Sequence, residues 1–148
     1  MHKQSVITIM GLHLLIFSQT VHGVGLHPGL NGSWHNPEQN GQGLVIHIAP
    51  ANNLLFAAWF TYSEAGGQQQ WLTAYGDLSS QPVNLTLTSS TGGGLNVSDP
   101  TPQQSVWGSG QLTFHDCISA TFQFSGSSEG QIELTRITPP INCIEDQP

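Results

Sequence analysis

Apolar and polar residues alternate with a period of two along several short segments of the chain. In residues 110–116, GQLTFHD, the apolar side chains Leu112 and Phe114 fall on one face and the polar side chains fall on the other. Residues 83–89 and 119–125 repeat this pattern. Clusters of Gly, Ser and Pro separate the segments, and no sustained helical period occurs beyond residue 23. The pattern predicts half-buried β-strands.

Two central segments, residues 54–62 and 69–77, are apolar or aromatic on both faces and are joined by SEAGGQ, whose paired glycines suit a hairpin loop. With residues 43–49 and 130–137 added, the chain has about seven or eight short strands. We therefore predict an all-β fold, an antiparallel up-and-down barrel of about 7–8 strands, with a two-sheet β-sandwich as the alternative. The barrel is favoured because closure removes exposed strand edges, which few charges protect in this chain.

Residues 89–105, SSTGGGLNVSDPTPQQS, interrupt the series of strands. The stretch is rich in Gly and Pro, which disfavour regular elements, so it predicts a long surface loop. Trp107 follows this stretch and is expected to anchor the next strand.

The first 23 residues have the features of a secretory signal peptide. Lys3 lies near the start, an apolar run covers residues 6–17, and polar residues then lead to a small one. The run is shorter than the roughly 20 residues that cross a bilayer, so cleavage is favoured over a membrane anchor. We expect a signal peptide at 1–23, a barrel domain at 24–138 and a C-terminal tail at 139–148, in a secreted protein that is extracellular or periplasmic.

Charge is scarce and negative in the rest of the chain. Beyond residue 23, Arg136 is the only strong base against nine Asp and Glu residues, which gives a net charge of −8. This composition argues against nucleic acid as a partner, because phosphate binding needs clustered Lys and Arg. No later segment of the sequence is apolar enough for a membrane-spanning helix.

Cys117 and Cys143 are the only cysteines of the chain. In an exported protein they are expected to form one disulfide, which closes a loop of about 26 residues and fastens the C-terminal tail to the barrel. The alternative, a reactive dithiol, lacks the CxxC spacing of redox sites.

The tripeptide GSW, which ends at Trp34, resembles the G-x-W sequence that begins the first strand of calycin barrels, the grouping of lipocalins and avidins. Arg136 lies near the end of the last expected strand, where that family has a basic residue. The resemblance implies that the Arg136 side chain packs over the Trp34 ring and closes one end of the barrel. Such a cation–π contact contributes roughly 0.5 to 2 kcal/mol.

A second resemblance covers nearly the whole chain beyond residue 23. The segments GSWHNPEQNGQGLVIHI, LLFAAWFTYSEAGGQQQWLTAYGDL and GSGQLTFHDCISATFQFSGSSEGQIELTRIT are similar in order and spacing to a repeat-like β domain of bacterial secreted proteins, found alone or attached to extracellular hydrolases. The matching positions are Trp34, Pro37, Gly41, Gly43, Trp59, Tyr62, Gly66, Trp71, Gly76, Cys117, Phe122, Gly130, Leu134 and Arg136. That family has no established enzymatic activity, so the resemblance implies architecture and compartment. Family members commonly have aromatic residues where this chain has His35 and Leu72, which reduces any shared aromatic surface.

Aromatic side chains are the best candidates for a binding site. Trp34, Trp59, Trp71 and Tyr75 combine a large apolar area with a polar atom, which suits sugar stacking on a sheet or a small apolar ligand in a barrel mouth. The alternative is that these rings belong to the core.

The segment before the second expected strand combines glycines with potential metal ligands. Gly41 and Gly43 permit backbone angles closed to other residues, so a shaped structural loop is expected there. His35, Glu38 and His47 offer ligands suited to zinc, but neither an HxH nor an HExxH spacing occurs. We expect His47 to project outward from its strand and expect neither a metal nor a cofactor.

The sequence contains no recognisable catalytic motif. It has no G-x-S-x-G elbow, and no acid lies in an aromatic cleft motif of the kind that marks glycoside hydrolysis. We predict a secreted, non-catalytic domain that binds a small molecule, a glycan or a protein. A structural or interaction module of the cell envelope without a ligand pocket is the alternative, and a hydrolase is the third hypothesis.

Overall fold

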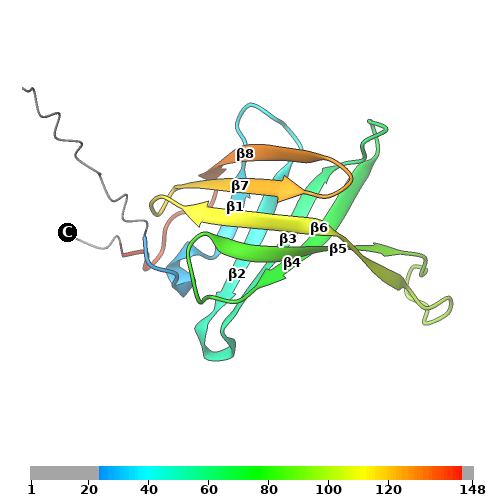
Figure 1. Cartoon of the computed structure of the whole chain (residues 1–148), viewed down its shortest axis with the longest axis horizontal. Helices are drawn as coiled ribbons and strands as arrows, with labels where there is room; N and C mark the ends of the chain where they lie inside the picture. The colour runs from blue at the N-terminus through cyan, green and yellow to red at the C-terminus, as the bar shows by residue number, and fades with distance from the viewer. Residues whose placement is uncertain (1–23, 145–148) are drawn as a thin grey trace, which may run out of the picture.

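The computed structural model describes residues 24–144, which form a closed antiparallel β-barrel (Figure 1). Its eight strands are β1 (Gly32–His35), β2 (Gly43–Ala49), β3 (Leu54–Tyr62), β4 (Gln69–Gly76), β5 (Val83–Thr91), β6 (Gln103–Phe114), β7 (Ser119–Ser125) and β8 (Glu129–Arg136). Each strand pairs with its neighbours in the sequence, and β8 pairs back with β1. The predicted up-and-down barrel is therefore confirmed, in preference to the β-sandwich. The expected signal peptide, residues 1–23, lies outside the described residues.

Side chains alternate between the barrel interior and the surface. In β3, Ala57 and Trp59 are buried, whereas Phe56 and Phe60 are exposed. An eight-stranded barrel has an interior just wide enough for side chains to fill, and the apolar inward residues pack there into one core. Its largest fully buried members are Trp34, Phe114, Phe122, Leu30, Leu44, Ile46, Ile48, Leu55, Leu72, Leu87, Leu112 and Val83.

One end of the barrel is closed by the N-terminal segment. The 3-10 helix η1 (Pro28–Leu30) places the Leu30 side chain in the core. The Trp34 indole nitrogen donates a hydrogen bond to the Leu30 carbonyl oxygen at 3.2 Å, and its ring packs edge-on against Phe114. This closed end therefore has both an apolar seal and a satisfied buried N–H group.

Arg136 ties the same end together. Its Cζ atom lies 5.6 Å from the centroid of the Trp34 ring, the arrangement expected from the GSW resemblance. Its guanidinium donates hydrogen bonds to the carbonyl oxygens of Gly29, at 2.7 Å, of Cys117, at 3.3 Å, and of Asn31. Partial burial lowers the pKa of Arg136 from its ordinary value.

The disulfide between Cys117 and Cys143 is confirmed, with an S–S distance of 2.04 Å. It joins the β6–β7 turn to the chain that follows β8. A disulfide of this kind is compatible with a secreted or periplasmic location. Residues 24–144 contain no helix with the length and apolar character needed to cross a membrane.

The opposite end of the barrel is ringed by the β1–β2, β3–β4, β5–β6 and β7–β8 connections. The prediction of a loop over residues 89–105 is wrong at both ends of that stretch, because β5 continues to Thr91 and β6 begins at Gln103. The two strands keep pairing there, and the hydroxyl oxygens of Ser89 and Ser105 lie 3.0 Å apart. Residues 89–91 and 103–105 thus extend the two strands, and together with the connection 92–102 they form an arm that projects beyond the barrel (Figure 1).

Candidate functional site

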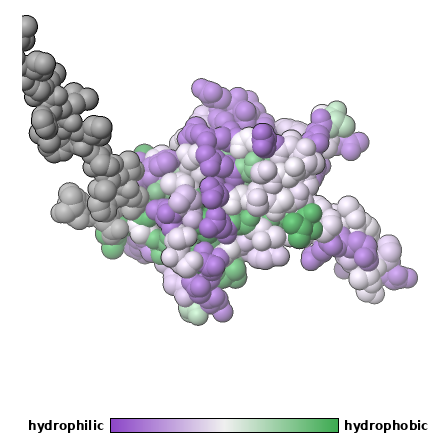
Figure 2. Space-filling view, in the orientation of Figure 1, coloured by the Kyte–Doolittle hydropathy of each residue, from purple (hydrophilic) through white to green (hydrophobic). Residues whose placement is uncertain are grey.

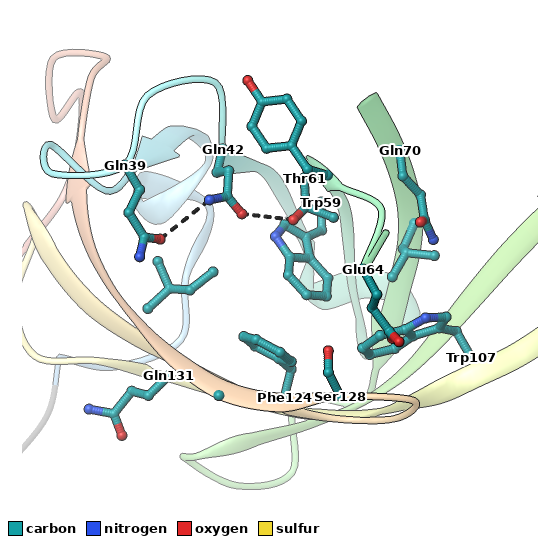
Figure 3. A pocket seen from close by; sticks show the side chains of 14 residues that line it. Gln39, Gln42, Trp59, Thr61, Glu64, Gln70, Trp107, Phe124, Ser128 and Gln131 are labelled. Atoms are coloured by element: carbon teal, nitrogen blue, oxygen red, sulfur yellow. Dashed lines mark hydrogen bonds between the residues drawn. The ribbon is translucent and has the colours of Figure 1, made fainter. Parts of the chain in front are cut away.

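A hollow of about 320 Å³, which we call the cup, lies at the ringed end of the barrel (Figure 3). It is lined by inward side chains at the ends of the strands and by residues of three connections. These residues are Gln39, Gln42, Trp59, Thr61, Tyr62, Glu64, Gln70, Leu72, Trp107, Phe124, Ser128, Gly130, Gln131 and Ile132. Pockets that hold small ligands begin at roughly this size.

Aromatic rings form the floor of the cup. The Trp59 ring lies 4.8 Å from Phe124, 5.1 Å from Phe122 and 5.7 Å from Trp107, measured between centroids. Trp107 and Phe122 meet it nearly edge-on, a favourable geometry for aromatic pairs. Mutual packing therefore fixes these rings, and half-buried Trp107 and Phe124 give the cup an apolar wall.

The Trp59 indole nitrogen is buried without a hydrogen-bond partner among the described residues. The side chain is 97% buried, so bulk water does not solvate this N–H group. Leaving a buried donor unpaired costs about 1–3 kcal/mol. By contrast, the indole N–H group of Trp34, at the closed end, has a hydrogen-bond partner. Trp59 lines the cup, and its unpaired donor lies beneath the surface of the hollow.

Amide side chains dominate the rim of the cup. The Thr61 hydroxyl donates to the Gln42 carbonyl oxygen at 2.7 Å, and the Gln42 amide donates to Gln39 at 3.4 Å. Figure 3 shows this chain of contacts above the Trp59 ring, with Gln70 across the opening. Carboxamides offer both donors and acceptors without charge, so the rim suits neutral polar groups.

Glu64 is the only carboxylate among the described residues that line the cup. The Ser127 hydroxyl donates a hydrogen bond to it and thereby connects the β3–β4 and β7–β8 connections across the mouth. With no Lys or Arg among the lining residues, the cup disfavours anionic ligands. Glycoside hydrolysis commonly uses a pair of carboxylates, which this lining does not supply.

Trp107 is a cup residue that the sequence interpretation missed. Inward residues of β6 such as Leu112 and Phe114 have even numbers, which would place Trp107 outside. The β5–β6 register shifts between Leu87 and Thr88, and this bulge turns Trp107 inward. Gly108, beside Trp107 in the strand, was the available signal, because glycine within a strand often marks a bulge.

The four aromatic residues predicted to bind ligand do not form one site. Trp34 is buried at the closed end, and Trp59 lines the cup. Trp71 and Tyr75 point outward from β4 and are 57% and 46% exposed. The structure thus separates an interior pair from an exterior pair.

Gly41 and Gly43 allow close approaches at the β1–β2 connection. Gly41 has a φ angle of +79°, and a Cβ atom there would collide with the Tyr62 hydroxyl. A Cβ atom on Gly43 would collide with the Trp34 carbonyl oxygen. Both positions therefore favour glycine, because a larger residue would displace the rim of the cup.

The weak metal candidates are dispersed. His35 is half-buried in β1, Glu38 lies exposed in the β1–β2 connection, and His47 projects outward from β2 as expected. Within residues 24–144, no group of three or more His, Cys, Asp or Glu side chains is close enough to hold a metal ion.

A hydrogen-bonded chain on the outer surface includes the residue types of a nucleophilic site. Thr121 Oγ1 lies 2.7 Å from His115 Nε2 and donates its proton to Glu133 at 2.9 Å. His115 must then donate to Thr121, whereas activation of a hydroxyl requires the imidazole to accept. These contacts therefore form a hydrogen-bonded row on the outer surface of the barrel, and they do not activate the Thr121 hydroxyl as a nucleophile.

Comparison of the chain with protein-family models, with curated proteins and with solved structures finds no match.

Proposed function

We propose that the protein is an exported, non-catalytic domain that binds a small neutral ligand in the cup. The observation that carries this proposal is a hollow of about 320 Å³ at the open end of the barrel, with aromatic rings in its floor and carboxamides at its rim. The ligand class follows from the lining. Aromatic rings suit an apolar face, and carboxamides suit hydroxyl or carbonyl groups, so we propose a mono- or disaccharide or a molecule of similar chemistry.

The disulfide and the signal-peptide pattern support export, because disulfides persist in oxidising compartments. A second candidate function, an interaction module of the cell envelope, is favoured by the outward aromatic residues of β3 and β4.

The experiment is a titration of the oxidised protein, residues 24–148, followed by ¹H–¹⁵N NMR and calorimetry. The probes are glucose, N-acetylglucosamine, cellobiose and the disaccharide of N-acetylglucosamine. Each of the four tryptophans gives one indole N–H signal, so the spectrum reports separately on the cup and on the outer surface. We expect the signals of Trp59 and Trp107 to shift and the signal of Trp71 to stay in place.

A matched pair of variants tests the location. Trp107→Ala removes a ring inside the cup, and Trp71→Ala removes one outside it. We expect Trp107→Ala to weaken binding at least tenfold and Trp71→Ala to change it less than twofold. Gln42→Leu, which removes an amide from the rim, is the second cup variant if Trp107→Ala fails to fold. Saturating probes that leave the Trp59 and Trp107 signals unmoved would contradict the proposal.

A further inference from the structure

Four aromatic side chains gather on the outer face of β3 and β4. Trp71 is 57% exposed, Phe60 48%, Tyr75 46% and Phe56 41%. Val45 of β2 adjoins them and is also exposed. We call these five residues the aromatic face. Large exposed rings gathered in one place on a small protein mark a surface that contacts something else.

The strand register arranges the aromatic face in rows. Phe60 lies opposite Trp71, and Phe56 lies opposite Tyr75. Between these two aromatic rows runs a row of smaller side chains that crosses four strands. Its members are Val45, Ala58, Thr73 and Thr88. The aromatic rows are four residues apart along each strand, roughly 13 Å at about 3.3 Å per residue. Each aromatic row therefore forms a ridge on the outer surface, and the row of smaller side chains forms a trough between the two ridges.

The aromatic face carries no formal charge. Within the described part of the chain, the outward positions of β2, β3 and β4 include no Asp, Glu, Lys or Arg. The nine acids of the chain lie in other segments. Two copies of this acidic protein therefore meet the least electrostatic repulsion when they approach through this face.

The opposite outer face has a different character. Asn84, Gln111, Gln123 and Gln131 lie in one row across β5, β6, β7 and β8. Side-chain hydrogen bonds join Gln111 to Asn84 at 3.0 Å and Gln123 to Gln131 at 2.8 Å. Figure 2 shows a hydrophilic band across these strands. Among residues 24–144, the exposed aromatic side chains thus lie on one side of the barrel.

The apolar area is large enough for a dimer. A large aromatic side chain has a surface of about 200 Å². Roughly half of that surface is exposed in each of the four residues, so together they present roughly 400 Å² to solvent. Val45, Leu54 and the smaller side chains between the rows raise this to about 600 Å², the upper end for the largest patch on a monomer. A stable interface buries about 800 Å² on each partner, which the patch and its polar border supply.

We propose that the aromatic face is an interface between two copies of this chain. A two-fold axis that runs parallel to the rows, midway between the row of smaller side chains and the Phe60–Trp71 row, places an aromatic row of each copy in the trough of the other. Such an interface is self-complementary, because the same ridge and trough serve both partners. This inference concerns the outer surface and is independent of ligand binding in the cup.

The experiment measures the mass of the oxidised protein, residues 24–148, by sedimentation velocity and light scattering from 1 to 200 μM. We expect a concentration-dependent monomer–dimer equilibrium with a micromolar dissociation constant. Trp71→Gln should raise that constant at least tenfold, because buried tryptophans dominate interfaces. Val45→Glu places two like charges near the axis and should have an effect of similar size. It also serves as the second variant if Trp71→Gln fails to fold.

The matched control is Ile118→Gln, which makes the same kind of change at an apolar residue that is 53% exposed in the β6–β7 turn. It should leave the dissociation constant within twofold. A wild-type protein that stays monomeric at 200 μM overturns the proposal, as does a dimer that Trp71→Gln and Val45→Glu leave intact. Retention of a monomer on insoluble polysaccharide, lost in Trp71→Gln, would assign the face to glycan instead.

Discussion

At the scale of single residues, Arg136 joins parts of the chain that are far apart in sequence. It connects the last strand to backbone carbonyls of the N-terminal segment and of the β6–β7 turn. Because its planar guanidinium serves several acceptors at once, a lysine cannot reproduce the arrangement. Arg136 is the only Lys or Arg residue in the sequence beyond residue 23, and it lies where the barrel closes.

Asp116 provides a pH-dependent contact in the β6–β7 turn. Partial burial by itself would raise its pKa, but hydrogen bonds from the Ser119 hydroxyl and from the backbone amides of Ile118 and Ser119, with a smaller contribution from His115, lower the pKa overall. A lowered folded-state pKa stabilises the protein above the unfolded value, and this stabilisation is lost as pH falls through the folded-state pKa.

We therefore expect Asp116→Ala to lower the free energy of unfolding by about 1–2 kcal/mol at pH 7. The loss should shrink as the pH falls below the ordinary aspartate range. Urea denaturation at several pH values measures it. Asp116→Asn is the control, because it keeps the acceptor without the charge and should show a smaller loss at pH 7. A loss for Asp116→Ala that is equally large at low pH would contradict the prediction.

The alternation in the sequence predicted which residues share a face, but it could not always predict which face is buried. Leu112 and Phe114 alternate with polar residues, so their inward direction follows from the sequence. The central segments are apolar on both faces, and nothing local distinguishes Trp59, which points inward, from Trp71, which points outward. A barrel mouth with aromatic residues was therefore one of the sites that the sequence suggested, whereas the lining of the cup required the closed barrel.

At the scale of the elements, the arm shows that composition predicts an irregular segment better than it predicts where the neighbouring strands end. The Gly- and Pro-rich residues 92–102 lie outside β5 and β6, whereas the flanking residues 89–91 and 103–105 extend the ladder of the barrel. Pairing continues because each strand offers unpaired backbone groups to the other. Sequence analysis missed this because hydrogen-bond partners are not visible in composition.

The disulfide adds stability at the element scale and leaves strand pairing intact. It spans 26 residues and joins the closed end to the tail, while β8 pairs with β1 independently of it. We expect the double variant Cys117→Ser and Cys143→Ser to lose about 3 kcal/mol of stability and to keep its β-sheet circular dichroism. Probe binding in the cup should be unchanged, because the disulfide lies at the other end. Complete unfolding of the variant at 25 °C would contradict this expectation.

At the scale of the whole molecule, a high negative charge accompanies an uncharged face. Repulsion between two copies with a net charge of −8 each opposes association, and salt screens it. We expect the dimer dissociation constant to fall a few-fold between about 20 and 500 mM NaCl. Sedimentation at both salt concentrations measures the change. An interface held by ion pairs would show the reverse dependence, which would contradict an apolar contact.

Both ends of the described chain lie at the closed end of the barrel. The Gln81 amide, in the β4–β5 connection, donates to the Val24 carbonyl oxygen at 3.0 Å, and His27 lies 3.8 Å from the Cys143 sulfur. The described chain therefore enters and leaves the barrel at the end opposite to the cup. A surface, tag or neighbouring domain that lies next to residues 24 and 144 faces the closed end of the barrel, and the cup and the arm face away from it.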